Sequence, residues 1–474
     1  MKRLVFCFDG TGNTLDRPHA TNVAITASAV KNLHRGVSQI VYYDEGVGTG
    51  GWKDKLVGGA TGEGLFQRVV EGYKFLVFNY EPGDEIFIFG FSRGAYTARS
   101  FAGLLQHVGV VNSCFADKIH VAASLYQQRE KKAAIEELDE INRFRAEFSP
   151  DLCASEQDRD WRAKFQDAAG APDLPVLKIK YIGVWDTVKT LGDPMLGDDD
   201  RDGEYDAAEF HDHRLHASVE AARHAVAIDE RRKKFDVTPW DNIDELNAAR
   251  EVSPDDPERP YQQQWFPGDH GSVGGGGEIR GLSDEALEWV WAGAKRQGLG
   301  LDISPHSKVW GIRPDVLSPT SNSNPEKKSW DLASVVMRNL PKGDRDGPIA
   351  MHEISKAALV RWAAPEGQNL ARWRPKPLDR LRRDMDEQTA GYEPWEFIAR
   401  GGFEAEGDYP AAVDGRGQPL RRYTIRAGTR SLADIAAQEL GDPGRTAEIL
   451  ALNRTTILDP DRFYAGQVIN LPNV

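Results

Sequence analysis

Apolar and polar residues follow two different periods in the first part of the chain. Short apolar runs predict strands at residues 4–8, 38–43, 85–89 and 177–184. Between these runs, Leu65, Val69, Tyr73 and Leu76 recur at helical spacing and predict a helix over residues 64–80. Strands that alternate with helices are typical of a mostly parallel sheet with helical crossovers, so we expect an α/β fold over residues 2–188.

Later stretches have a weaker pattern. Residues 116–170 are charged and helix-prone, which leaves two interpretations open: a lid over a functional site, or a solvated helical excursion. Residues 365–419 are poor in regular pattern and rich in Pro, Gly, Arg and Glu. Such a composition indicates a segment that wraps the surface and ends in a linker.

Composition narrows the class of protein. The chain has 474 residues and a net charge of −14, which disfavours nucleic acid as a partner. Only three cysteines occur, without C-x-x-C spacing, so a disulfide framework is not expected. The first apolar run is too short for a signal peptide and no run reaches the roughly 18 apolar residues of a membrane span. We therefore expect synthesis in the cytoplasm, with any export bypassing the general secretory route.

The segment Gly90-Phe91-Ser92-Arg93-Gly94 carries the strongest chemical signal. It lies between a predicted strand and a helix-like stretch, the context in which G-x-S-x-G forms a nucleophile elbow. The flanking glycines leave room for a tight turn that exposes the Ser92 hydroxyl at the sheet edge. The alternative is an ordinary glycine-rich loop.

A serine nucleophile requires a base and a group that orients the base. In the chain order Ser, Asp, His that is typical of α/β-hydrolases, Asp186 after the fourth predicted strand and His270 in a glycine-dense loop meet the requirement. Taken singly, Asp186 could be a helix cap and His270 a turn histidine. Their order relative to Ser92 favours a catalytic triad.

An oxyanion hole would use the amide of Arg93, which follows the serine, and an amide from the loop after the first strand. In Phe8-Asp9-Gly10-Thr11-Gly12-Asn13 the candidates are Gly10 and Thr11. This loop lacks the spacing of known phosphate-binding motifs. Whether Asp9 buttresses the loop or binds a cation stays open.

Several histidines lie close together in His211-Asp212-His213-Arg214-Leu215-His216, with His224 nearby. They lack a metal-binding pattern such as H-E-x-x-H, and surface or helix-start histidines are the favoured interpretation. No metal and no organic cofactor is needed for the chemistry expected of Ser92.

Four motifs, spaced in order along residues 2–375, together resemble one known family. They are Phe8-Asp9-Gly10-Thr11-Gly12-Asn13, Gly90-Phe91-Ser92-Arg93-Gly94-Ala95, Gly183-Val184-Trp185-Asp186-Thr187-Val188 and the loop from Gly268 to Gly276. The set resembles the α/β-hydrolase family that includes phospholipase effectors of type VI secretion. The resemblance implies a serine lipase or esterase with the triad Ser92, Asp186 and His270. It also implies a phospholipid or other ester substrate, delivery to a target-cell periplasm, and a secretion-apparatus or immunity protein as partner.

Two positions depart from that family's pattern. The histidine loop has Ser272 where the family usually has Asp, and Gly277 where an aromatic residue often ends the glycine run. These departures leave the orientation of His270 open.

The end of the chain resembles a second family. Arg422-Tyr423-Thr424-Ile425 with the following helix-like stretch, and Gly466-Gln467-Val468-Ile469-Asn470-Leu471-Pro472, resemble the opening and closing parts of a LysM domain. That resemblance implies a small βααβ module over residues 421–474 that binds N-acetylglucosamine polymers of peptidoglycan. The alternative is a module that docks to protein.

These observations predict three parts: an α/β-hydrolase catalytic domain over residues 1–375, a wrapping segment and linker over 376–420, and a LysM-like domain over 421–474. The expected function is hydrolysis of carboxylic esters, most of all in glycerophospholipids, by a type VI secretion effector. The alternatives are a small-ester or acyl hydrolase without a membrane role, and a non-catalytic protein that binds or docks through its LysM-like part.

Overall fold

The structure is a computed structural model and describes most of the chain. The described residues are 1–10, 13, 15, 18–46, 62–128, 134–165, 173–188, 213–302, 312, 314–322, 340–364, 372–390, 418, 420–426, 428–453 and 468–473. In this part of the chain no helix is long and apolar enough to cross a membrane. The three cysteines are all free.

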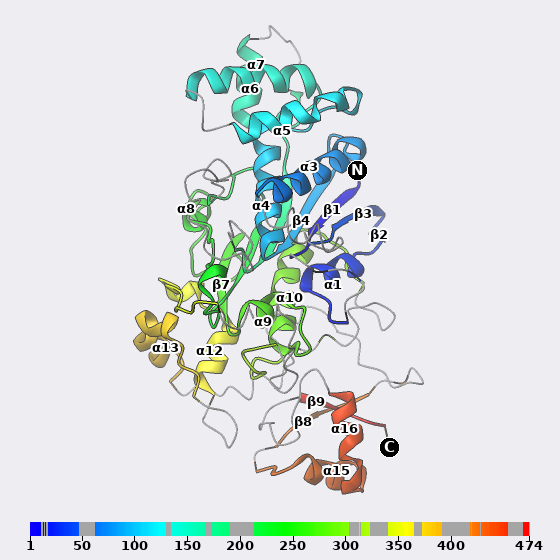
Figure 1. The fold of residues 1–474 in the computed structure, drawn as a ribbon, viewed down its shortest axis with the longest axis vertical. Coiled ribbons are helices and arrows are strands. Elements are labelled where there is room, and N and C mark those ends of the chain that lie inside the picture. Colours follow the sequence, from blue (N-terminus) through cyan, green and yellow to red (C-terminus); the bar gives the residue numbers. More distant parts are fainter. Residues whose placement is uncertain are drawn as a thin grey trace.

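A seven-stranded sheet forms the centre of the larger part of the molecule (Figure 1). Its strands lie in the order β2 (Leu33–His34), β3 (Val37–Asp44), β1 (Arg3–Phe8), β4 (Glu85–Phe91), β5 (Ile179–Trp185), β6 (Ala222–Ala227) and β7 (Tyr261–Phe266). All neighbouring pairs are parallel except the short β2 with β3. The predicted mostly parallel α/β fold is therefore confirmed.

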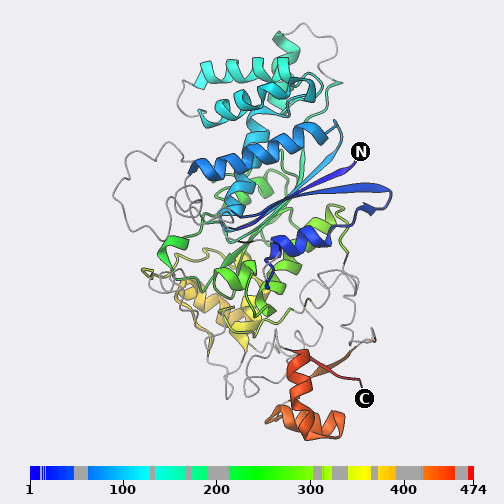
Figure 2. The same ribbon diagram turned by 45° about the vertical axis from the view of Figure 1, so that its right-hand side comes forward.

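Alternating side chains explain why this sheet has a helical layer on each face. In β1, Leu4, Phe6 and Phe8 enter one core, whereas Val5 and Cys7 enter the other. Helices α3 (Gly62–Asn79) and α4 (Arg93–Val108) cover the first face, and α1 (Asn22–Ala29) and α10 (Gly281–Arg296) cover the second (Figure 2). Strands buried on both faces give the near-continuous apolar runs seen in the sequence.

Four of the strands and the helix α3 lie where the sequence places them, with ends that differ by one or two residues. Strands β6 and β7 were not predicted. They carry buried polar residues, among them Arg223, His224, Gln262 and Gln263, which interrupt an apolar pattern. Hydrogen bonds within the core satisfy these side chains, for example His224 Nδ1 with Gln263 Oε1 at 2.9 Å.

The helical excursion after α4 lies at the far end of that helix from Ser92. It contains η1 (Ser113–Lys118), α5 (Ile119–Gln127), α6 (Ala134–Phe148) and α7 (Glu156–Phe165). Arg145 of α6 donates to the carbonyl of His107, near the last turn of α4, whereas Ser92 precedes its first turn. A helix of 16 residues is about 24 Å long. The lid interpretation is therefore wrong for these helices, which form a solvent-facing layer (Figure 1).

After β6, the chain adds short elements before and after β7. They are η4 (Lys233–Phe235), α8 (Ile243–Ala248), α9 (His270–Gly274), η5 (Met351–Glu353), α12 (Lys356–Ala363), η6 (Lys376–Leu381) and α13 (Arg382–Gln388). Leu378, Leu381 and Met385 of the expected wrapping segment pack with Trp265 and Trp362 in one core. This part of the segment is thus helical and attached to the sheet.

The C-terminal residues form a unit with a core of their own. Its elements follow in the order β8 (Arg421–Thr424), α15 (Leu432–Leu440), η7 (Pro443–Arg445), α16 (Thr446–Leu452) and β9 (Val468–Leu471). Strands β8 and β9 pair antiparallel, and apolar residues of both strands and both helices share one cluster. The order strand, helix, helix, strand is the one expected from the sequence, while the LysM assignment stays a prediction.

Candidate active site

Ser92 lies in a sharp turn between β4 and α4. Its backbone has φ 58° and ψ −126°, a conformation that non-glycine residues rarely adopt. Both flanking glycines are needed for space: a Cβ on Gly90 would lie 2.6 Å from Ala95 Cα, and one on Gly94 would lie 2.2 Å from the carbonyl oxygen of Phe8. The Ser92 amide donates to the carbonyl of Trp185 at 3.0 Å, which ties the turn to β5. This local geometry is compatible with the nucleophile elbow expected from the sequence.

Asp186 follows β5 directly and reaches the histidine predicted as its partner. His270 Nδ1 lies 2.6 Å from Asp186 Oδ2. Asp186 has a positive φ of 38° and is fully buried, while Ser92 and His270 are 7% and 6% exposed. His270 is the first residue of α9, whose N-cap Asp269 accepts from the Ser272 amide. Parallel strands bring these loops to one edge of the sheet, because their carboxyl ends lie side by side.

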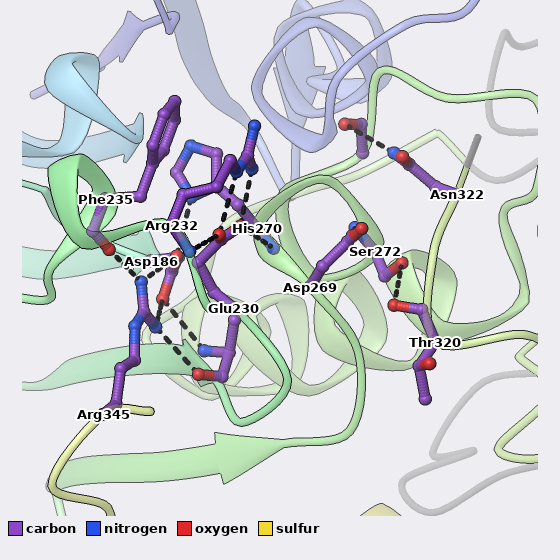
Figure 3. Close-up of polar contacts among 12 residues, drawn as sticks. Asp186, Glu230, Arg232, Phe235, Asp269, His270, Ser272, Thr320, Asn322 and Arg345 are labelled. Carbon is purple, nitrogen blue, oxygen red and sulfur yellow. Dashed lines mark hydrogen bonds and ion pairs between the residues drawn. The ribbon is translucent and has the colours of Figure 1, made fainter. Parts of the chain in front are cut away.

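Arg345 completes the surroundings of Asp186 and was not predicted. Its Nη1 donates to Asp186 Oδ1 at 2.7 Å and its Nη2 to Oδ2 at 3.0 Å, and the Ala227 amide also donates to Oδ1 (Figure 3). Burial by itself raises the pKa of Asp186, but the charge of Arg345 and the hydrogen bonds from His270 and Arg345 hold that pKa well below its ordinary value. Asp186 is therefore ionised at neutral pH.

An ionised Asp186 determines the tautomer of His270. A carboxylate only accepts hydrogen bonds, so Nδ1 of His270 must carry the proton that it shares with Oδ2. Neutral imidazole has one proton, which leaves Nε2 as the basic nitrogen. The pair is thus arranged to take up a proton at Nε2.

Two aromatic rings and a second carboxylate enclose His270. Phe91 and Phe235 have ring centroids 4.6 Å and 4.9 Å from that of His270. The His270 amide donates to Glu230 Oε2 at 3.3 Å, and Glu230 pairs with Arg232, whose guanidinium lies over the Phe235 ring. Figure 3 shows Glu230, Arg232 and Phe235 near the imidazole. Burial would raise the pKa of Glu230, but Arg232 and His270 lower it below its ordinary value.

The loop after β1 lies against the serine. A Cβ on Gly10 would lie 3.3 Å from Ser92 Cβ, so only a small residue fits there. The Gly10 amide itself donates to Asp9 Oδ1 at 2.6 Å. Of the three predicted oxyanion donors, Gly10 is therefore engaged within its loop, Arg93 begins α4, where the helix dipole favours negative charge, and Thr11 lies outside the described residues.

Asp9 buttresses this loop. Besides the Gly10 amide, its carboxylate accepts from Thr21 Oγ1 at 2.6 Å, Tyr43 OH at 2.7 Å and Asn13 Nδ2 at 3.4 Å. Burial raises the pKa of Asp9 in spite of these bonds. Of the two interpretations left open for Asp9, the structure supports the buttress.

The two departures in the histidine loop have structural counterparts. Ser272 Oγ donates to the carbonyl of Thr320 at 3.1 Å, and the Ser272 amide donates to Asp269 Oδ1 at 2.9 Å. A Cβ on Gly277 would lie 2.6 Å from the Asn322 backbone oxygen, so Asn322 occupies the space beside the end of the glycine run. Residues 320 and 322 thus hold the loop that carries His270 (Figure 3).

The predicted histidine cluster is dispersed in the described part of the chain. His211 and Asp212 lie outside that part, and His213 and His216 are half-buried in a loop. His224 is neither a surface nor a helix-start residue, because it is fully buried on β6. Burial, and to a lesser extent the charge of Arg99, lower the pKa of His224 to about 3. Its Nε2 accepts from the Thr187 amide at 3.2 Å, next to Asp186. Among the described residues, no group of three or more His, Cys, Asp or Glu is arranged to hold a metal ion.

Arg345, His224 and the Glu230–Arg232 pair were missed as site residues. Arg345 stands in the charged segment Lys342-Gly343-Asp344-Arg345-Asp346, which by composition looks like a solvated loop. Glu230 and Arg232 belong to a run of charged residues from 229 to 234, and nothing in their spacing indicates a role. A contact across 159 residues, such as that of Arg345 with Asp186, leaves no local signal.

Comparison with known proteins yields a family and a few distant relatives. An uncharacterized protein of Saccharomyces cerevisiae is 27% identical over 248 residues, which are 49% of this chain and 32% of the relative. The crystal structure of an uncharacterized protein from Pseudomonas aeruginosa is similar with a TM-score of 0.37 and 18% identity, over 63% of this chain and 46% of that one. A structure of the Tle1 effector bound to the VgrG spike from the type VI secretion system gives a TM-score of 0.28 and 16% identity, over 57% of this chain and 50% of that one.

The chain thus spans about a third of the length of its yeast relative and about half of each solved structure. The family model for the catalytic domain of Tle1-like type VI secretion phospholipase effectors matches residues 2–293, which contain Ser92, Asp186 and His270. The chain belongs to this family of Tle1-like phospholipase effectors.

Proposed function

We propose that this chain is a serine esterase that cleaves glycerophospholipids and acts as an antibacterial type VI secretion effector. The observation that carries the proposal is the 2.6 Å contact between His270 Nδ1 and the ionised Asp186, beside the strained turn of Ser92. Family membership supports a phospholipid over other esters. A secretion-apparatus component as partner and delivery to a target-cell periplasm are part of the same proposal.

The proposed reaction begins when Ser92 Oγ attacks the ester carbonyl carbon and His270 Nε2 takes the hydroxyl proton. Asp186 stabilises the imidazolium that forms. The carbonyl oxygen becomes an oxyanion at the N-terminus of α4, where the Arg93 amide and an amide of the loop after β1 receive it. Because the Gly10 amide donates to Asp9, Thr11 is our preferred second donor.

Collapse of this intermediate breaks the ester C–O bond, and His270 gives its proton to the departing alcohol. The acyl group then remains on Ser92. Water attacks the acyl carbon with His270 again as base, and the fatty acid leaves as Ser92 regains its proton. Ser92, His270, Asp186, the backbone amides and water account for every step.

Covalent labelling with a fluorophosphonate probe tests the nucleophile. We expect the native chain to be labelled and Ser92→Ala to be unlabelled and inactive on esters. Ser100→Ala is a matched control, since Ser100 is a buried serine on the same helix α4. Labelling that survives Ser92→Ala would refute the assignment and favour a non-catalytic binding or docking protein.

The substrate class needs a separate test. We expect fatty acid release from vesicles of defined glycerophospholipids to exceed, in kcat/KM, the hydrolysis of short-chain nitrophenyl esters. Activity on the short esters alone would replace the phospholipase by a small-ester hydrolase without a membrane role.

For the C-terminal unit we propose a LysM-like domain that binds N-acetylglucosamine polymers. The order β8, α15, α16, β9 around a single apolar core supports this proposal. We expect the full chain to sediment with insoluble peptidoglycan, and a chain that ends at residue 390 to stay in solution. Equal sedimentation of both would favour docking to protein.

A further inference from the structure

We propose that Arg345 is a positioning residue of the hydrolase site, which holds Asp186 ionised and aligned for His270. The proposal rests on the proposed serine-esterase function. Arg345 lies beyond residues 2–293, so the family match does not include it. Its side chain is 4% exposed, and both terminal nitrogens bond the two oxygens of a carboxylate that is fully buried. A bidentate pair of this kind fixes the carboxylate in both distance and orientation.

The backbone around Arg345 is itself anchored next to the site. The Lys233 amide donates to the carbonyl of Pro341 at 2.9 Å, and the Gly343 amide donates to that of Arg231 at 2.8 Å. Asp344 adds ion pairs with Arg231 and Lys376. We call residues 340–347 the strap. These bonds fix the strap to the loop after β6, so Arg345 reaches Asp186 from a defined position.

The guanidinium also binds the scaffold on either side of the carboxylate. Nη1 donates to the carbonyl of Ala227 at 2.8 Å, at the end of β6, and Nη2 donates to the carbonyl of Phe235. The ring of Phe235 packs edge-on against His270. A single side chain therefore links the acid, the strand next to it and a ring that confines the base (Figure 3).

The charge of Arg345 acts on the pKa of Asp186, whereas its forked hydrogen bonds act on the orientation of that carboxylate. Among the described residues, the titratable groups that face Asp186 are His270 on α9, Arg345 on the strap, His224 on β6 and Arg232 after β6. Burial keeps His224 neutral, and Arg232 is paired with Glu230. Arg345 is thus the cation that offsets burial of Asp186. Without it, burial raises the pKa of Asp186, so this carboxyl group takes up a proton at higher pH and its negative charge is lost from the site.

These two effects separate in two variants. Arg345→Met removes the charge and the forked donors, so we expect kcat to fall about 10- to 100-fold with KM within about twofold. We also expect the acid limb of the pH–rate profile to move up by about one pH unit or more, because an adjacent cation shifts a carboxyl pKa by about 1 to 3. Arg345→Lys keeps the charge but not the fork, so kcat should fall while the acid limb stays near its native position.

Arg145→Met is the matched control. Arg145 is also a buried arginine that bonds backbone carbonyls, but it lies on α6, away from Ser92. The Arg145→Met variant should have a lower Tm than the native chain and the same pH–rate profile. All profiles are measured with a soluble nitrophenyl ester on chains shown to be folded by circular dichroism, and Arg345→Lys carries the test where Arg345→Met does not fold.

Native kcat in Arg345→Lys, or a folded Arg345→Met with the native acid limb, would overturn the positioning role. Failure of the esterase proposal has a different signature, namely ester hydrolysis that persists in Ser92→Ala. The two results are independent, since the first leaves Ser92 essential.

Discussion

Phe91 lies against His270, with ring centroids 4.6 Å apart and an angle of 32° between the rings. Because Phe91 directly precedes Ser92, the ring that confines the proposed base is joined to the proposed nucleophile by one peptide bond. Phe91 also fills the space next to Gly274, where a Cβ would lie 1.9 Å from a ring carbon. The position of the imidazole thus depends on a glycine in its own helix.

We expect Gly274→Ala to disturb the site through Phe91. The added methyl group forces the ring to move, which costs about 1 to 3 kcal/mol of stability by overpacking. Displacement of His270 should reduce kcat about 10- to 100-fold. Steady-state kinetics and thermal denaturation measure both effects. Gly444→Ala, where the nearest atom is a side-chain oxygen at 3.1 Å in the C-terminal unit, should leave the kinetics unchanged. Native kinetics in Gly274→Ala would contradict the dependence on Phe91.

Asp186→Asn should nearly abolish turnover. An amide nitrogen opposite His270 Nδ1 reverses the tautomer and puts the proton on Nε2, so we expect kcat to fall by about 10⁴-fold, the size seen for the corresponding change in a serine protease triad. Asp158→Asn is the control, because Asp158 and Arg162 form another buried ion pair, on α7. Both variants should lose stability, and only Asp186→Asn should lose activity. An active Asp186→Asn would show that another group orients His270.

Asp9→Ala should release the loop after β1. Four hydrogen bonds from described residues end on this carboxylate, and buried donors without an acceptor cost about 1 to 3 kcal/mol each. If the loop supplies an oxyanion donor, kcat should fall about 10²- to 10³-fold with little change in KM. Asp84→Ala removes a comparably buried carboxylate, bonded to Lys2 and Glu81 at the opposite end of β4, and should retain native kcat. Equal kinetics in the two variants would argue against the role of the loop.

Glu285→Gln should stabilise the chain, and more so as pH rises. Burial, with Glu288, Asp315 and Asp284 nearby, raises the pKa of Glu285 well above its ordinary value. A raised pKa means that the folded state binds the proton more tightly. This contribution to stability is complete below the unfolded pKa of about 4.3 and is lost as pH rises toward the folded pKa. The gain in Tm of the variant over the native chain should therefore be small near pH 4 and larger above about pH 7. A difference in Tm between Glu285→Gln and the native chain that stays constant with pH would contradict a raised pKa of Glu285.

The sequence alone determined the alternation of strands and helices in the first half of the chain, and with it the parallel α/β class. It also singled out Ser92, Asp186 and His270 as candidates. These features are local: strands buried on both faces are continuous apolar runs, and a nucleophile elbow needs glycines at fixed offsets, because Gly90 and Gly94 approach neighbouring backbone. The order Ser92, Asp186, His270 along the chain is typical of α/β-hydrolases and favoured a catalytic triad.

Tertiary structure alone decided what surrounds these residues. Strands β6 and β7 escaped the pattern because their polar side chains, such as His224 and Gln263, satisfy one another in the core. The helices α5, α6 and α7, whose charged sequence left a lid possible, follow the end of α4 that is far from Ser92. Arg345 reaches Asp186 across 159 residues, and its charge looks solvated until the fold buries it. Hydrophobic periodicity records which residues are buried, but it does not record which buried charges meet, since that depends on how distant loops converge at one edge of the sheet.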